Sequence, residues 1–153
     1  MEQTGHTVDL AEIDPSELSA EEIEKEGWLY KESRFWKVWR KRWCVLTKKN
    51  ITFGGKTMPT SHSWLFTFDS ESWQTDGKPP TEKICMGLCR TVKSIEDEVN
   101  KENAFKIDID GTPFRFQAES YADKEQWIGG LGRAMIKKTV MLDNQMDNLP
   151  DFL

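Results

Sequence analysis

The chain has 153 residues, of which 37% are hydrophobic and 31% are charged, and its formal net charge is −5. This length suits one domain with a sizeable core and does not require two. No stretch approaches the roughly 20 apolar residues that span a bilayer, and the N-terminus lacks the basic start and apolar core of a signal peptide. The start Met1-Glu2 also excludes N-myristoylation of the sequence as written.

Residues 1–25 are predicted to be an acidic leader. The first 26 residues contain nine acids and one base, a net charge of −8, so we expect the beginning of this segment to be disordered. Asp14-Pro15 and the pair Ser19 and Glu22 are helix-start patterns, which predict a short helix in the second half of the leader. The negative charge leads to the hypothesis that the leader competes with an anionic ligand for a basic site.

Residues 27–46, GWLYKESRFWKVWRKRWCVL, are predicted to form a β-hairpin. Both ends of the run are enriched in aromatic and β-branched residues, as half-buried strands are, and residues 32–39 between them are too few for a useful helix. Between Trp28 and Asn50 the chain has eight cations and one acid, a net charge of +7. The positive charge of this acidic protein is therefore concentrated in one hairpin.

Lys31, Arg40 and Arg42 are the candidate ligand-binding residues of the hairpin. Arg40 and Arg42 are two residues apart on one strand and so face the same side, and the paired strand brings Lys31 beside them. Three converging cations repel one another unless an anion lies among them, and guanidinium groups suit phosphate oxygens because two donors reach two acceptors. The alternative is a basic edge hairpin whose charges stay solvated.

Aromatic residues among the cations favour a membrane surface over the solvated alternative. Phe35, Trp36 and Trp39 are interleaved with the basic residues. Indole rings lie at headgroup depth and cations meet anionic lipid, so a loop that is both basic and aromatic suits a bilayer interface. We expect Phe35 and Trp36 to insert. The residues expected to add diffuse electrostatic attraction are Arg34, Lys37 and Lys41.

The segment after the hairpin alternates short strands with punctuated loops. Residues 47–62 are predicted to be mainly loop because they contain Gly54-Gly55 and Pro59, and residues 63–68 are preferred over 51–53 as the third strand. The remaining predicted strands are residues 83–89, 91–96, 104–109 and 114–118, with the Asp110-Gly111 turn joining the last two.

One helix is predicted after the strands, over residues 121–139, with Ser120 as its N-cap. Its predicted apolar stripe consists of Ile128, Leu131 and Met135, with Trp127 alongside. Its three glycines each cost about 1 kcal/mol relative to alanine, which predicts a compensating close approach of the helix to a sheet.

The predicted fold is mainly β. Residues 26–140 are expected to form a seven-stranded, two-sheet antiparallel barrel that is closed at one end by the C-terminal helix. Residues 141–153 are expected to be an acidic tail.

Catalysis, a cofactor and a metal are not expected. The sequence has no Gly-x-Ser-x-Gly elbow, P-loop, His-Glu-x-x-His motif or dinucleotide fingerprint, and it has two histidines. Cys44, Cys85 and Cys89 fall in apolar segments and are predicted to be reduced core residues. Nucleic acid is the weaker ligand candidate, because the basic charge is confined to one hairpin of an acidic chain.

The hairpin and the helix together resemble pleckstrin-homology (PH) domains. EGWLYK, a short basic loop and WRKRWCVL resemble the opening hairpin of that family, and Trp127 in KEQWIGGLGRAM resembles the tryptophan of its C-terminal helix. The resemblance spans roughly residues 26–138 and implies the PH fold. Many phosphoinositide-binding members have a lysine on the first strand and a basic-x-arginine pattern on the second, which Lys31, Arg40 and Arg42 match position by position.

A closer resemblance bears on the ligand. PTEKI, TVKSIEDE and DKEQWIGGLGRAM are similar to acylated PH proteins of apicomplexan parasites, which sense phosphatidic acid on secretory organelles, although the N-terminal acylation signals of that group are not present here. Highly selective phosphoinositide binders of the family also use a tyrosine on the third strand. No tyrosine lies between Ile51 and Phe68, which leaves phosphatidic acid as an alternative to phosphoinositide.

The expected function is that of a lipid-binding, membrane-targeting module without enzymatic activity. We expect a monomer that binds phosphatidic acid or phosphoinositide headgroups, as a lipid sensor in regulated secretion, on the cytosolic face of a membrane or secretory organelle. The alternative is a protein-interaction scaffold of the same fold with no specific lipid ligand.

Overall fold

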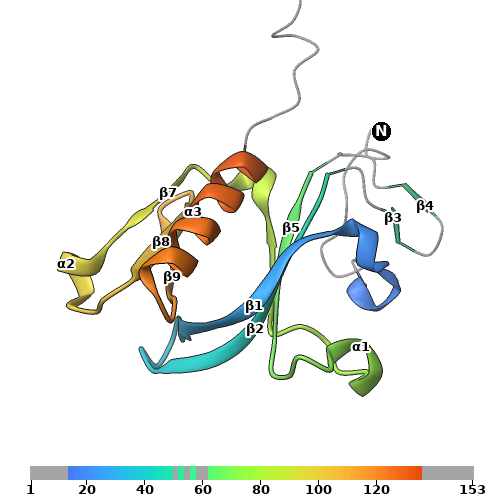
Figure 1. Ribbon diagram of the computed structural model, residues 1–153, viewed down its shortest axis with the longest axis horizontal. Helices are drawn as coiled ribbons and strands as arrows, with labels where there is room; N and C mark the ends of the chain where they lie inside the picture. The colour runs from blue at the N-terminus through green and yellow to red at the C-terminus, as the bar shows by residue number, and fades with distance from the viewer. Residues whose placement is uncertain (1–13, 50–51, 54–55, 58–61, 136–153) are drawn as a thin grey trace, which may run out of the picture.

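The structure is a computed structural model that describes residues 14–49, 52–53, 56–57 and 62–135. Within these residues, seven antiparallel strands form one hydrogen-bonded sheet in the order β6-β5-β2-β1-β9-β8-β7 (Figure 1). The strands are β1 Ile23–Glu32, β2 Trp39–Thr47, β5 Trp64–Phe68, β6 Glu82–Cys85, β7 Thr91–Ser94, β8 Ala104–Ile109 and β9 Thr112–Gln117. The predicted mainly β fold with a C-terminal helix is confirmed.

The third strand is the one that the sequence favours. β5 pairs with β2 from Trp43↔Phe68 to Leu46↔Leu65, and all five of its residues are buried. The competing segment forms a separate small hairpin, in which β3 (Thr52–Phe53) pairs with β4 (Lys56–Thr57). The burial of both faces of β5 explains why WLFTF, which is apolar apart from Thr67, lacks the alternation of a half-exposed strand.

β1 connects the two halves of the sheet. It pairs with β2 along nearly its whole length, but with β9 through two pairs, Tyr30↔Gln117 and Lys31↔Phe116. Figure 1 shows the two halves meeting at this point and diverging toward α3 (Tyr121–Met135). The two predicted sheets are therefore two halves of one continuous sheet that bends where β1 passes from one neighbour to the other.

The main core lies between these halves and beneath α3. Leu29, Phe105 and Phe116 are among its fully buried side chains, each of which contributes roughly 1.5–3 kcal/mol through burial. α3 contacts β1, β7, β8 and the 3₁₀ turn η5 (Met86–Leu88), which links β6 to β7. The helix therefore packs over the inner face of the sheet, against β1, β7, β8 and the turn that follows β6.

The start of α3 agrees with the prediction, but its buried face is rotated. The Asp123 N–H donates to Ser120 Oγ at 3.0 Å, which confirms the N-cap. The buried large apolar side chains of the helix are Trp127 and Leu131, followed by Ala134, whereas the predicted stripe residues Ile128 and Met135 are only partly buried. Trp127 belongs to the centre of the packed face because its large ring fills the core.

Close approach of α3 to the sheet is confirmed at one glycine. A Cβ atom on Gly130 would lie 3.4 Å from Leu46 Cδ2, at the limit of ordinary contact. A larger side chain at this position would have to push the helix away from β2. Residues 136–139 of the predicted helix and the predicted tail 141–153 lie outside the described residues.

A second apolar cluster covers the opposite face of the β2–β5–β6 half. It contains Val45, Phe66, Phe68 and Trp73, and the leader contributes Leu18, which is 4% exposed. Gln74 Nε2 in α1 (Trp73–Asp76) donates to the Leu18 carbonyl at 2.8 Å and thereby fixes the leader to the sheet. The described part of the leader is thus a structural element of the domain.

The leader differs from the predicted short helix. Two 3₁₀ turns, η3 (Pro15–Glu17) and η4 (Ala20–Glu22), are present, and β1 already begins at Ile23, three residues before the expected domain boundary. Asp14 accepts from the Ser16 N–H at 3.0 Å and Glu22 accepts from the Ser19 N–H at 2.9 Å, so both cap patterns are real. Each cap begins a turn of only three residues, because the chain must then extend to join the sheet. Residues 1–13 lie outside the described residues.

Two connecting segments differ from the sequence prediction. The predicted strand 83–89 ends at Cys85 and continues as η5, since the chain must turn beneath α3. The loops after β5 and β7 contain the one-turn helices α1 and α2 (Glu96–Val99), which lack the apolar period that sequence analysis relies on. None of the helices among the described residues has the length and apolar character needed to cross a bilayer.

Candidate anion-binding site at the β1–β2 hairpin

The predicted cations of the hairpin converge on one open pocket. Lys31 and Arg40 are directly paired across β1 and β2, and Arg42 pairs with the core residue Leu29, so all three cations face the inner side of the hairpin. The pocket has a volume of about 270 Å³, slightly below the usual range for small-molecule sites. Its lining residues are Lys31, Ser33, Arg34, Phe35, Arg40, Arg42, Thr81 and Glu82.

Lys31 forms the floor of the pocket and is 7% exposed. Its Nζ lies 3.4 Å from Glu82 Oε2, 3.5 Å from the Glu32 carbonyl oxygen and 5.6 Å from the centroid of the Phe114 ring. Burial lowers the pKa of Lys31, and the neighbouring Glu82 carboxylate opposes that shift. An anion that enters the pocket would favour the charged ammonium in the same way as Glu82.

Glu82 is a site residue that the sequence analysis did not identify. It begins β6, and its Oε2 also lies 3.4 Å from Arg34 Nε, so one carboxylate bridges two cations. The Arg34 guanidinium lies 5.2 Å from the Phe114 ring centroid. The sequence prediction placed the start of the fourth strand at residue 83 and so left Glu82 out of it. Alternation within one strand also does not show which side chains of other strands lie beside it.

The two arginines of β2 differ in how far they are already neutralised. Arg42 Nη1 lies 3.1 Å from Asp69 Oδ1 and also donates to the Lys41 carbonyl oxygen at 3.1 Å. Arg40 is exposed, and its side chain has no hydrogen-bond or ion-pair partner among the residues that the structure describes. Four cations and the carboxylate of Glu82 line the pocket, and Asp69 adds a second carboxylate at its margin, so the charge balance stays positive. Arg40 is the cation most available to a ligand.

The loop between the strands projects apolar side chains beyond the pocket. The Ser33 N–H donates to the Val38 carbonyl oxygen at 2.7 Å and the Lys37 N–H donates to the Ser33 carbonyl oxygen at 3.0 Å, so the loop is internally hydrogen-bonded. Phe35 is 83% exposed and Trp36 77% exposed. This tip has the combination of exposed aromatic side chains and nearby cations that suits a membrane interface.

Two predicted supporting cations lie outside the pocket. Lys37 is at the loop tip, where its backbone adopts a φ of 57°. Lys41 pairs with Tyr30 and therefore faces the outer side of the hairpin, where its Nζ lies 5.0 Å from the Trp28 ring centroid. Of the three cations predicted to add diffuse attraction, the structure brings Arg34 into the pocket.

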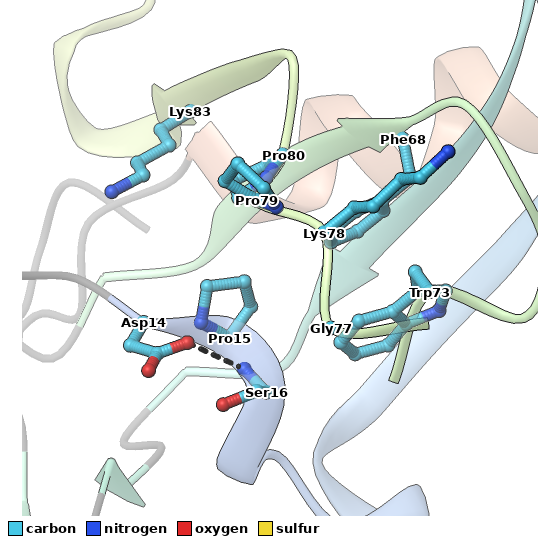
Figure 2. A pocket seen from close by; sticks show the side chains of 10 residues that line it. All are labelled: Asp14, Pro15, Ser16, Phe68, Trp73, Gly77, Lys78, Pro79, Pro80 and Lys83. Carbon is cyan, nitrogen blue, oxygen red and sulfur yellow. Dashed lines mark hydrogen bonds between the residues drawn. The ribbon is translucent and has the colours of Figure 1, made fainter. Parts of the chain in front are cut away.

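A second hollow lies on the other side of β5 and β6, between the leader and α1. It is lined by Pro15, Trp73, Pro79 and Pro80 among others, and Figure 2 shows the side chains of Lys78 and Lys83 reaching toward opposite ends of it. Its acid, Asp14, accepts the hydrogen bond of the Ser16 N–H. Because its cations do not converge, this hollow is a weaker anion site than the hairpin pocket.

A bent antiparallel sheet of seven strands, joined through its first strand and covered by one C-terminal helix, defines a β domain of the pleckstrin-homology type. The chain belongs to the PH domain family, whose pattern matches residues 23–135. Pleckstrin homology domain-containing protein 1 of Arabidopsis thaliana is 32% identical over an alignment of 130 residues, and the match covers 81% of each of the two chains.

Solved structures are similar to the chain at the level of the fold. The C-terminal PH domain of pleckstrin has a TM-score of 0.56 at 23% identity, and the match covers 74% of this chain and 97% of that one. The same domain in complex with D-myo-Ins(1,2,3,5,6)P5 has a TM-score of 0.55 at 23% identity, covering 74% and 96%. The Slm1 PH domain in complex with phosphoserine has a TM-score of 0.52 at 23% identity, covering 71% and 91%.

Proposed function

We propose that this chain is a peripheral membrane-binding module that recognises a phosphate-bearing lipid headgroup in the hairpin pocket. The observation that carries the proposal is the convergence of Lys31, Arg40 and Arg42 beside an exposed aromatic tip. In this proposal the three cations bind the phosphate, while Phe35 and Trp36 enter the headgroup region. The phosphate-containing ligands in structures of similar PH domains support the same chemistry.

The electrostatic free energies of these cations favour weak, reversible binding to a membrane. Each Lys or Arg near an anionic leaflet contributes about 1 kcal/mol, and this contribution decreases with salt. Glu82 and Asp69 already neutralise part of the pocket charge, so the headgroup must exchange with them to some extent. A headgroup can readily displace Asp69 from Arg42, because partly exposed ion pairs are worth about 0–1 kcal/mol. The buried Lys31 ammonium needs a charged partner at every stage, either Glu82 or the headgroup.

The identity of the lipid is part of the proposal. A pocket of one carboxylate and four cations accepts a compact phosphate monoester, as in phosphatidic acid, or a phosphoinositide headgroup. The missing tyrosine on β5 is the sequence feature that keeps phosphatidic acid in consideration. The acylated apicomplexan group and a role in secretion stay predictions from resemblance.

Vesicle sedimentation tests the proposal. Vesicles of zwitterionic lipid are compared with the same vesicles containing phosphatidic acid or a bisphosphorylated phosphoinositide, each at low and at physiological salt. We expect binding to one or both anionic types, weaker binding at higher salt, and little binding to the zwitterionic control.

Charge reversal assigns the binding to the pocket. Arg40→Glu should abolish most of the binding, because it removes the cation without an intramolecular partner and adds a repulsive charge. Lys93→Glu is the matched control, since Lys93 is an exposed cation on the far edge strand β7. Equal binding of the two variants would place the membrane contact elsewhere. Failure of the wild-type protein on every vesicle would favour the protein-scaffold alternative.

A further inference from the structure

The outer side of the β1–β2 hairpin carries an aromatic surface that the pocket does not use. Side chains alternate between the two sides of a strand, so the partners Trp28↔Trp43 and Tyr30↔Lys41 face away from Lys31 and Arg40. Trp39 faces the same side, opposite Glu32. We call this surface the outer aromatic face and define it by Trp28, Tyr30, Trp39, Lys41 and Trp43. The acids Glu26 and Glu32 lie on the same side, but Glu26 accepts a hydrogen bond from Trp43 and Glu32 is paired with Arg115 at 3.0 Å.

The rings of this face are packed against one another and stay partly exposed. Trp28 and Trp43 form an edge-to-face pair with centroids 5.3 Å apart, and Trp43 Nε1 donates to Glu26 Oε1 at 3.0 Å. Tyr30 is 39% exposed, and Trp28 and Trp39 are half-buried. Leu18 of the leader covers the neighbouring part of this side of the sheet. Trp43 lies at the boundary, because it is partly buried against the cluster that contains Leu18.

Two lysines lie directly over the tryptophans. Lys41 Nζ is 5.0 Å from the Trp28 ring centroid, and Lys101 Nζ is 5.2 Å from the Trp39 ring centroid. Within the described ranges, neither ammonium group lies in ion-pair distance of a carboxylate. The face therefore presents cations and aromatic rings together, and the cations are available to an external anion.

This composition fits a bilayer interface better than a protein partner. Tryptophan and tyrosine are enriched at headgroup depth, and lysine is attracted to anionic lipid there, whereas lysine is depleted at the cores of protein interfaces. The face also lies close to the exposed tip along the chain, because only Lys37 and Val38, which is 43% exposed, separate Trp39 from Trp36. One hairpin thus carries aromatic surface from its tip along its outer side.

The length of the face determines how the hairpin meets the membrane. The face extends away from the loop tip along both strands, from Tyr30 to Trp28 on β1 and from Trp39 to Trp43 on β2. At about 3.3 Å per residue, the longer of these two segments measures roughly 13 Å. The interfacial layer on each side of the hydrocarbon core is about 5–7 Å thick. A hairpin that enters end-on would place Tyr30 and Trp39 in this layer, and an oblique hairpin would also include Trp28.

We propose that the outer aromatic face is a second membrane-contact surface, which lies obliquely on the headgroup layer while the pocket on the inner side holds a phosphate. This inference rests on the proposed function. The pocket then provides headgroup selectivity, and the outer face adds affinity that does not depend on which anionic headgroup is present.

Fluorescence quenching by lipids that carry a quencher near the headgroup tests the contact directly. Trp36→Phe removes the tip indole, and Trp64, Trp73 and Trp127 are at most 4% exposed. The remaining three of the seven tryptophans, Trp28, Trp39 and Trp43, all belong to the outer aromatic face. We expect vesicle-bound Trp36→Phe protein to be quenched by the shallow quencher. Vesicle binding without quenching would overturn the inference.

A matched pair of double variants measures the contribution to affinity. Tyr30→Ser/Lys41→Gln removes one exposed ring and one cation from the face, and Tyr121→Ser/Lys93→Gln makes the same changes on α3 and β7. We expect the first to bind anionic vesicles roughly fivefold more weakly, with an unchanged ratio between phosphatidic acid and phosphoinositide vesicles. The second should bind as the wild type does.

The outcomes separate this inference from the proposed function. If Tyr30→Ser/Lys41→Gln binds as tightly as its control while Arg40→Glu is defective, the pocket stands and the outer face is not a membrane surface, which would leave it to a protein partner. If the wild-type protein binds no anionic vesicle, the proposed function fails first. A change in headgroup preference in the Tyr30→Ser/Lys41→Gln variant would also contradict the proposal, because it would place Tyr30 or Lys41 in the headgroup site.

Discussion

Glu82 Oε2 lies 3.4 Å from Lys31 Nζ, so the most buried cation of the hairpin pocket is held by a carboxylate of the same chain. The same oxygen lies 3.4 Å from Arg34 Nε. In the proposed function, Glu82 therefore occupies the position of a phosphate oxygen. It keeps a buried ammonium paired before a ligand arrives and competes with that ligand afterwards.

Glu82→Gln is expected to strengthen binding to anionic vesicles. The amide keeps an acceptor for Lys31 but removes the negative charge that repels the headgroup, so we expect affinity to increase roughly fivefold, as for about 1 kcal/mol. Vesicle sedimentation at fixed salt measures the change. Glu119→Gln is the control, because it removes an equal charge at an exposed position after β9. A similar gain in both variants would show that only net charge matters.

Acid should weaken a contact between α2 and α3. The Asn103 N–H donates to Glu96 Oε2 at 2.6 Å, and the buried Lys124 ammonium lies 3.3 Å from the same oxygen. The Asn103 hydrogen bond, followed by that of Lys124, lowers the pKa of Glu96 below its ordinary value of 4.5. The folded protein thus binds this proton less tightly than the unfolded chain does. Its stabilising contribution is complete above pH 4.5 and is lost as the pH falls through the lowered pKa.

Glu96→Gln tests this pH dependence. The variant should have a lower Tm than the wild type at pH 7, and the difference should disappear as the pH falls well below 4.5. Circular dichroism melting curves across this range give both values. Glu119→Gln should show no such pH-dependent difference, and a gap that stayed constant down to pH 3 would exclude Glu96 titration as its cause.

The leader is expected to stabilise the domain through Leu18. This side chain is 4% exposed in the outer apolar cluster, so Leu18→Ala should lower the free energy of unfolding by roughly 2–4 kcal/mol. Urea denaturation provides the measurement, and Glu17→Ala in the same turn is the exposed control. Similar unfolding free energies for the two variants would contradict the packing of the leader on the sheet.

Glycine substitutions are expected to have opposite effects at two positions. A Cβ atom on Gly132 in α3 would lie 3.9 Å from Val92 Cγ1, an ordinary contact, so Gly132→Ala should raise the unfolding free energy by about 0.5–1 kcal/mol through helix propensity. Gly77 ends α1 with a φ of 70°, where alanine is strained, so Gly77→Ala should lower it. Urea denaturation of both variants checks the signs, and equal signs would contradict this account.

Local patterns predicted much of the molecule. Alternation and the short loop determined the β1–β2 hairpin, and with them the shared face of Lys31 and Arg40, because the register of a hairpin is set by its own residues. The N-cap of α3 at Ser120 could be predicted for the same reason, since a cap involves residues three apart.

Contacts between distant segments could not be predicted in this way. Glu82 and Asp69 reach the pocket from beyond β2, because β5 and β6 lie beside the hairpin in the sheet order. The rotation of α3 that centres its buried face on Trp127 and Leu131 depends on the shape of the core beneath it.

The sequence by itself therefore determined the strands, the helix and the concentration of positive charge in the first hairpin, since each of these depends on neighbouring residues. Only the tertiary structure decided which cations are already paired, which remain available, and that the leader covers one part of the outer sheet face but leaves the aromatic part exposed. The physical reason is that strand order and helix packing bring together residues far apart in the chain, and no local period records these encounters.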